Sequence, residues 1–484
     1  MRKQSISRLC ILVLCSFSIG TSAFAQNYSH YWSHQFGREG IFLSGAVLAG
    51  PEDNTAAIYN PAALSFTKGE GIGLSFLSGG LSSLNFRDAL GDEINLKQTA
   101  LFVLPKFLAF DIPVFKNTKG HLVFTLFHKD FLKLRQNFRE VFTEPERPNQ
   151  AIINSFHLEK DQQEVWAGLA YAYPISKSLS AGITLFVPRH SHEYDLTLRK
   201  DRTFDNFPGL LEEFQQFSYT YNYSLFALQT KLGLTFIPPR MENLRLGLTF
   251  TTPSFLHVAA KGDYYYRFIE FQEDPPAGLP PNPGQFDNAN LDAKATYKFP
   301  MALGVGAQYA FTKLTLYASA EHFFGIDPYI VIDANRNPYG DFPLPDEWPL
   351  FPLYHKSDPI TNLAFGLSYQ LKDGIQLLGG FQTDRNYYTE PIRPQEEATI
   401  LQTFNSGWNV FHLSLGTSLL KNQNEIAIGL RYSFSFENNV LALGNINDPN
   451  SRFLDFAERE DATADVRYNA ISIALTYNFF KEFL

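Results

Sequence analysis

Fourteen stretches of the chain alternate apolar side chains with small or polar ones at every second position. In one of them, Ile426, Ile428, Leu430, Tyr432 and Phe434 are separated by Ala427, Gly429, Arg431 and Ser433. A period of two residues places the two kinds of side chain on opposite faces of a β-strand. The sequence therefore predicts an all-β protein whose strands are apolar on one face.

The connections between these stretches alternate between short and long. The predicted strands lie approximately at 70–78, 97–115, 119–143, 155–173, 179–200, 217–236, 244–267, 291–311, 313–332, 359–371, 374–388, 407–421, 424–443 and 466–480. Longer loops are predicted near 79–96, 144–154, 201–216, 268–290, 333–358, 389–406 and 444–465, with tight turns between them. An even number of strands joined in this way is the layout of a transmembrane β-barrel. Several strands are also longer than sandwich strands usually are.

The composition excludes further classes of protein. Charged residues make up 18% of the 484 residues, aromatic residues 15%, and the formal net charge is −9. These values exclude a disordered chain and a strongly basic nucleic-acid binder. Beyond residue 25, no stretch of about 18 apolar residues offers a transmembrane helix, so a membrane protein of this sequence has to be a closed barrel. A secreted soluble β-rich binding protein is the alternative outside the membrane class.

Residues 1–25 have the features of a secretory signal peptide. Arg2, Lys3 and Arg8 precede a short apolar core, and Ala23-Phe24-Ala25 supplies a cleavage site. Both cysteines, Cys10 and Cys15, lie in this segment, so we expect no disulfide and no thiol chemistry in the exported chain. No nucleophile, phosphate-loop or zinc-protease motif is found, and we predict neither an enzyme nor a cofactor.

Residues 26–68 do not follow the strand pattern. A short helix is predicted from Glu52 to Tyr59, with Pro51 at its start and Asn60-Pro61 at its end. Fourteen strands enclose a wider space than the eight whose interior is filled by side chains, so the lumen is open unless something closes it. We therefore divide the chain into a signal at 1–25, a candidate hatch or plug at 26–68 and a barrel at 69–484.

Three groups of residues resemble the FadL-type long-chain fatty-acid and hydrocarbon transporters of Gram-negative outer membranes. The first is Gly45-Ala46-Val47-Leu48-Ala49 followed by the run from Asp53 to Leu64, which is similar to the hatch with its Asn-Pro-Ala motif. The second is 246–253, followed by His257 and Lys261-Gly262, and the third is the Pro-led strand at 299–306. The chain departs from the family in having Ala63 where Gly is common, and five residues after Phe479.

The resemblance implies a fold and a function. It implies a 14-stranded antiparallel barrel in the outer membrane, closed by an N-terminal hatch that contains Asn60, Pro61 and Ala62. It also implies passive uptake of a hydrophobic small molecule, which passes sideways through the wall near a kink in the third strand. We expect a monomer in contact with outer-membrane lipid. The alternatives within the membrane are a general diffusion porin and a structural barrel.

The ligand contacts are not predicted by any motif. The inward-facing cations Lys231, Arg245 and Arg431 are candidates for holding a carboxylate, and the other interpretation is that they are lumen-wall charges paired with acids. His190 and His192 share a strand face, but no third ligand accompanies them and we predict no metal. The aromatic residues of the 333–358 loop form either a landing patch or a lid.

Overall fold

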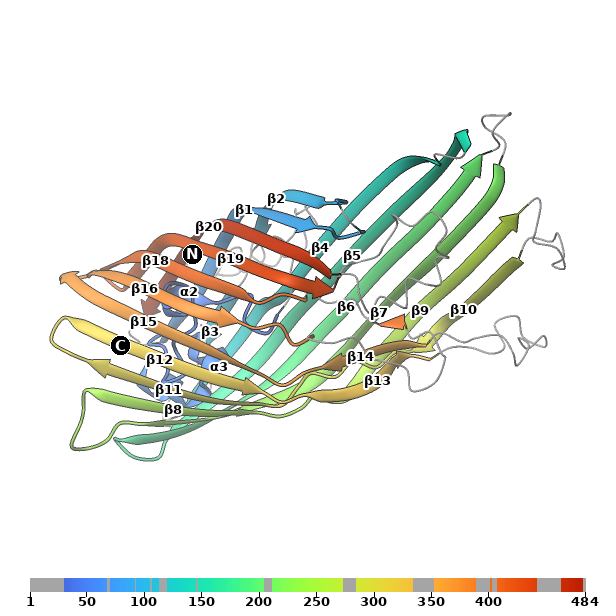
Figure 1. Cartoon of the computed structure of the whole chain (residues 1–484). Helices are drawn as coiled ribbons and strands as arrows, with labels where there is room; N and C mark the ends of the chain where they lie inside the picture. The colour runs from blue at the N-terminus through green and yellow to red at the C-terminus, as the bar shows by residue number, and fades with distance from the viewer. Residues whose placement is uncertain are drawn as a thin grey trace, which may run out of the picture.

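The computed structural model describes residues 30–67, 70–91, 93–104, 107–112, 120–144, 147–203, 211–272, 284–333, 352–388, 401–402, 407–441 and 463–481. These residues form a closed antiparallel barrel of 14 strands (Figure 1). The barrel closes between β1 (Glu70–Arg87) and β20 (Thr463–Lys481), which pair along their whole length. The all-β prediction, including the number of strands, is confirmed.

The remaining barrel strands follow in chain order. They are β2 (Leu96–Leu104) with β3 (Phe107–Asp111), β4 (His121–Glu144), β5 (Arg147–Pro174), β6 (Leu179–Thr203), β7 (Leu211–Phe236), β8 (Leu244–Thr251) with β9 (Phe255–Gln272), β10 (Gly284–Lys294) with β11 (Ala302–Ala310), β12 (Leu314–Phe323), β15 (Ile360–Lys372), β16 (Ile375–Asp384), β18 (Val410–Lys421) and β19 (Asn424–Leu441). A small separate sheet contains β13 (Ile326–Ile332), β14 (Leu353–Ser357) and β17 (Leu401–Gln402).

Several predicted boundaries are wrong. The loop predicted at 144–154 is largely strand, because β5 begins at Arg147, and the loop predicted at 79–96 is shortened by the extension of β1 to Arg87. Both stretches contain several Gly, Ser, Asn or Pro residues, which are typical of turns, yet they pair with neighbouring strands. Two predicted continuous strands are interrupted at 252–254 and at 295–301. A third, predicted at 313–332, breaks after Phe323, and its second half forms β13 of the separate sheet. The segments 1–29 and 334–351 lie outside the described residues.

The predicted helix at 52–59 is also shorter than expected. Only Ala56–Tyr59 (α3) is α-helical, and it ends at Asn60 as predicted. A 3₁₀ helix (η1, Pro61–Phe66) follows at once, and Gly37–Phe42 (α2) forms a helix that the sequence did not indicate. Two of the six α2 residues are glycine, which is a poor helix former, so local propensity gives no signal there. No helix among the described residues is long and apolar enough to cross a membrane.

The outer surface carries a band of exposed aliphatic and aromatic side chains. On β19 and β20 it includes Ile426, Ile428, Leu430, Ile471 and Ile473, each about half exposed. The inward positions between them are small or polar, as the alternation predicted. An apolar band of this kind around a closed barrel is the surface that faces lipid.

The polarity of β6 and β7 inverts along their length. Toward the tight turns, the outward residues of β7 are Phe236, Leu234 and Leu232, and the inward residues include Thr235, Lys231 and Gln229. Further along, the outward residues are Ser224, Asn222 and Thr220, and the inward ones are Tyr223, Tyr221 and Tyr219. β6 changes in the same way between Val187 and Arg189. The strands thus leave the apolar band with a polar outside and an aromatic inside, and Figure 1 shows β4 to β7, β9 and β10 projecting well beyond β18 to β20.

The outward apolar band predicts the effect of a buried charge. Ile428→Lys places an ammonium on the lipid face and should lower the free energy of unfolding by about 2–4 kcal/mol. Ser191→Lys, on the polar outward face of the β6 projection, should change it by less than about 0.5 kcal/mol. Denaturant unfolding of both variants in phospholipid vesicles measures the difference, and equal effects would contradict the position of the band.

Candidate functional site

Residues 30–67, here called the lumen segment, lie inside the barrel and are held together by Tyr59. The Tyr59 hydroxyl accepts a hydrogen bond from the Phe36 backbone N–H at 2.8 Å and donates to Gln35 Oε1 at 2.9 Å. Burial raises the pKa of this phenol above its usual range, so it stays neutral and can act as donor. The contact joins α3 to the start of α2. The segment is therefore a folded unit rather than an extended strand of chain.

Asn60 attaches the lumen segment to the wall. Its side-chain amide donates to Leu48 O at 2.9 Å and to Leu234 O of β7 at 3.1 Å, while its Oδ1 accepts from the Ala62 N–H at 3.2 Å. The Ser180 hydroxyl of β6 donates to Ala62 O at 2.6 Å. One asparagine thus satisfies backbone groups of the segment and the barrel together. The structure places Asn60, Pro61 and Ala62 side by side against β6 and β7.

Glycines on the inner wall make room for this close approach. A Cβ atom at Gly182 would overlap Pro61, one at Gly233 would overlap Asn60, and one at Gly247 would overlap the Leu48 carbonyl. The same holds around the barrel at Gly306 against Ala49, Gly380 against Leu43, and Gly416 against Phe42. The small residues of the alternating pattern therefore form the surface on which the lumen segment rests.

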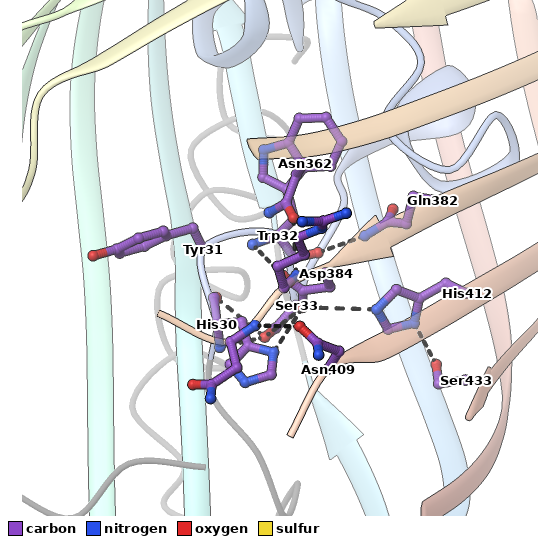
Figure 2. A network of polar contacts seen from close by, with 12 residues as sticks. His30, Tyr31, Trp32, Ser33, Asn362, Gln382, Asp384, Asn409, His412 and Ser433 are labelled. Carbon is purple, nitrogen blue, oxygen red and sulfur yellow. Dashed lines mark hydrogen bonds and ion pairs between the residues drawn. The ribbon is translucent and has the colours of Figure 1, made fainter. Parts of the chain in front are cut away.

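Asp384, at the end of β16, binds the beginning of the lumen segment (Figure 2). Its Oδ1 accepts from the Trp32 N–H at 3.0 Å and its Oδ2 accepts from the Ser33 hydroxyl at 3.2 Å. His30 and His412 flank the same carboxylate, with ring nitrogens 3.6 and 3.7 Å from Oδ2. Because Asp384 serves two groups of the segment, it is a main attachment of this end.

Two further side chains hold the same end through its carbonyls. Gln382 donates from Nε2 to Trp32 O at 2.8 Å, and Arg431 donates from Nη1 to Ser33 O at 2.9 Å. Together with Asp384 they pair both the N–H and the C=O groups of this turn with the barrel. The first residues of the lumen segment are thus fixed by side chains of two strands, β16 and β19.

A cavity with a volume of about 100 Å³ lies between the lumen segment and the wall formed by β4 to β8, β11 and β12. Seven rings of the barrel chain line it: Phe127, Trp166, Phe186, Tyr297, Phe299, Phe323 and Tyr387. Tyr31 of the lumen segment is stacked between Phe323 and Tyr387, with ring centroids 4.4 and 4.5 Å away. A pocket of carbon surface with a few polar groups is the usual form of a small-molecule site.

The charged groups at the cavity are paired. Lys231 Nζ lies 3.2 Å from Glu321 Oε1, and Glu321 Oε2 accepts from the Trp32 indole at 2.8 Å. Lys129 donates to Tyr31 O at 2.5 Å. Of the predicted cations, Lys231 therefore lines the cavity in an ion pair, whereas Arg245 donates to Gly50 O at 3.3 Å and Arg431 holds Ser33. Among the described residues that line the cavity, both lysines, Lys129 and Lys231, are engaged in these contacts.

The two histidines bind phenols and an acid instead of a metal. His190 contacts Glu164 at 3.0 Å and stacks on Tyr297 at 3.8 Å between centroids, and His192 lies 3.2 Å from the Tyr223 hydroxyl. Among the described residues no group of three metal-ligating side chains occurs. The pair belongs to the aromatic inner wall of the projection.

The backbone pairing of the wall is interrupted next to the cavity. β3 pairs with Val123–Phe127 of β4, but from His128 onward the ladders of the described residues join β4 to β5 alone. β2 is paired with β1, and a side-chain contact between Gln98 and Gln136 at 3.2 Å bridges β2 to β4. A bulge falls between His128 and Asp130, and both Lys129 and Asp130 line the cavity. The third strand is therefore irregular where the cavity meets an unpaired seam.

Comparison with solved structures identifies the fold. A FadL homologue from Pseudomonas aeruginosa aligns over 95% of this chain and 99% of its own, with 12% identity and a TM-score of 0.54. The Pseudomonas putida toluene transporter TodX aligns over 95% and 100%, with 14% identity and a TM-score of 0.54. No protein-family model and no curated protein matches the sequence. The chain has the fold of the FadL-type channels, as its motifs predicted.

If Asp384 holds the lumen segment, removal of its carboxylate should loosen the segment. Asp384→Leu leaves the Trp32 N–H and the Ser33 hydroxyl without their acceptor, which costs about 1–3 kcal/mol for a buried donor. We expect the time spent in open states to rise by about tenfold in planar-bilayer recordings. Asp195→Leu, outward on the β6 projection, is the control. Identical recordings from both variants would show that Asp384 does not hold the segment.

Proposed function

We propose that this protein is an outer-membrane channel for the passive uptake of hydrophobic small molecules, with the lumen segment as its hatch. The observation that carries the proposal is the change of polarity along β6 and β7, in which the outward face turns from apolar to polar and the inward face from polar to aromatic. Outside the bilayer, a polar outward face and an aromatic inward face keep the rings away from water, which gives the projection an apolar interior. An apolar ligand gains about 0.8 kcal/mol for each CH₂ that leaves water, so such an interior binds it without a motif.

The solved channels of this fold support the proposal. TodX is described as a toluene transporter and as a monoaromatic hydrocarbon channel. The cavity of this chain has ring-lined walls suited to the same kind of ligand. The apolar outer band, the tight turns at one end and the long connections at the other support an outer-membrane location, and the signal at 1–25 supports export.

Tyr31 connects the cavity to the hatch. Its ring occupies the slot between Phe323 and Tyr387, and its carbonyl holds Lys129. A planar ligand that enters this slot displaces Tyr31, and with it the adjoining Trp32 and Ser33 contacts to Asp384. Ligand binding and release of the hatch are therefore coupled through one short stretch of chain. In this proposal Asn60, Pro61 and Ala62 form the opposite attachment, at which the hatch stays anchored.

The unpaired seam between β2 and β4 is the exit. It begins at His128, beside the bulged Lys129 and Asp130 of the cavity. Unpaired backbone is tolerated at membrane depth only where it borders protein or a cavity. An apolar ligand leaving here enters the bilayer without crossing the polar surface of the lumen segment.

Removal of the hatch tests the closure of the lumen. Deletion of residues 30–64 should raise single-channel conductance several-fold, because fourteen strands enclose more space than side chains fill. Liposome swelling by sugars should appear in the deletion variant and be absent in the intact protein. Swelling by sugars in the intact protein, without uptake of hydrocarbons, would indicate a general diffusion porin instead.

Cross-linking of the seam tests the exit. Cysteines at Gln98 and Gln136, the two side chains that meet across β2 and β4, can be joined by a short bis-maleimide. We expect transfer of a hydrophobic probe into vesicle lipid to fall at least several-fold after joining. Each single-cysteine variant treated with the same reagent is the control. An unchanged rate in the joined protein would exclude this exit while leaving the cavity in place.

A further inference from the structure

Gln229 of β7 lines the cavity with an amide whose orientation is fixed by the backbone. Its Nε2 donates to Thr252 O at 2.8 Å and to Pro300 O at 3.1 Å. These two contacts use both hydrogens of Nε2, so Oε1 is the polar atom of this side chain that they leave unused. The residue is 2% exposed, and its Oε1 has no hydrogen-bond partner among the described residues. A buried acceptor without a partner is unfavourable and calls for an explanation.

The two carbonyls that hold Gln229 belong to the interruptions of neighbouring wall strands. Thr252 lies between β8 and β9, and Pro300 lies between β10 and β11. The interruptions are also joined to each other, because Ser254 N donates to Phe299 O at 3.1 Å and Phe299 N donates to Ser254 Oγ at 2.9 Å. The position of Gln229 is thus set by three strands. An acceptor held so firmly can select a ligand by geometry.

The carboxylates at the cavity are already engaged. Glu321 binds Lys231 and the Trp32 indole, and Glu164 binds His190 and the Trp166 indole. Asp130 accepts from the Phe131 N–H at 2.9 Å and from Gln162 at 3.1 Å. Gln229 Oε1 is therefore an acceptor of a cavity-lining residue that makes no hydrogen bond among the described residues.

We propose that Gln229 is a specificity-determining residue, and that the ligand is an apolar ring compound carrying a hydroxyl donor, such as a phenol or an aromatic alcohol. The ring lies against Phe186, Phe299 and Trp166, and the hydroxyl donates to Gln229 Oε1. This proposal rests on the proposed function and narrows it. An apolar pocket alone discriminates poorly between a ligand and its hydroxylated isostere, whereas a placed acceptor favours the hydroxylated one.

The test compares two ligands of nearly equal shape, p-cresol and p-xylene. Their Kd values are measured by calorimetry with the full-length protein in nanodiscs, with protein-free nanodiscs as the blank. In Gln229→Leu, the preference for p-cresol relative to p-xylene should fall by about 2- to 10-fold, the range for one net hydrogen bond. Gln163→Leu, outward on β5, is the matched control and should leave the preference unchanged.

A third ligand keeps the test decisive if Gln229→Leu does not fold. 4-Methylanisole has the oxygen of p-cresol without its donor, so the intact protein should bind it more weakly than p-cresol. Equal binding of these two, or a preference that Gln229→Leu does not change, overturns the role of Gln229 but leaves the channel for hydrophobic molecules standing. Failure of the intact protein to bind any of the three ligands overturns both proposals.

Discussion

The structure depends on the requirement that every backbone N–H and C=O within hydrocarbon find a partner inside the protein. A sheet meets this requirement only by closing, and here β1 and β20 close it along 70–87 and 465–481. Closure of fourteen strands then creates a lumen that side chains of the wall do not fill. The lumen segment fills part of this space with its own folded backbone. The cavity is the remainder, bounded by the segment on one side and by aromatic wall residues on the other.

The same requirement explains where the wall is irregular. The interruptions at 252–254 and 295–301 expose backbone carbonyls, and Gln229 supplies donors to two of them from the lumen side. The seam between β2 and β4 likewise begins beside the cavity. Interruptions of the ladder are thus found where protein side chains or the cavity can replace the lost pairing. Each of these interruptions also lies next to a residue that we propose as functional. The breaks in the hydrogen-bond ladder and the site therefore coincide.

The sequence predicted the barrel well because alternation is a local property of each strand. It also predicted the end of α3 at Asn60, because an Asn-Pro pair ends a helix, whereas the role of Asn60, Pro61 and Ala62 in a hatch stays a prediction. Other site residues gave no such signal. Asp384 and Gln229 are ordinary inward polar residues of a predicted strand, and their importance arises from Trp32 and Thr252, which are distant in the sequence. The strand ends at 79–87 and 147–154 were misplaced, because their Gly, Ser, Asn and Pro residues resemble a loop.

The charge pairing at the cavity depends on the position of the lumen segment. While Tyr31 is in place, its carbonyl accepts from Lys129, and Lys231 is neutralised by Glu321. If a ligand displaces Tyr31 as we propose, the Lys129 ammonium loses this carbonyl and needs another oxygen acceptor, because an unpaired buried ammonium is strongly unfavourable. The contact of Lys129 therefore stabilises the arrangement in which the Tyr31 ring lies between Phe323 and Tyr387.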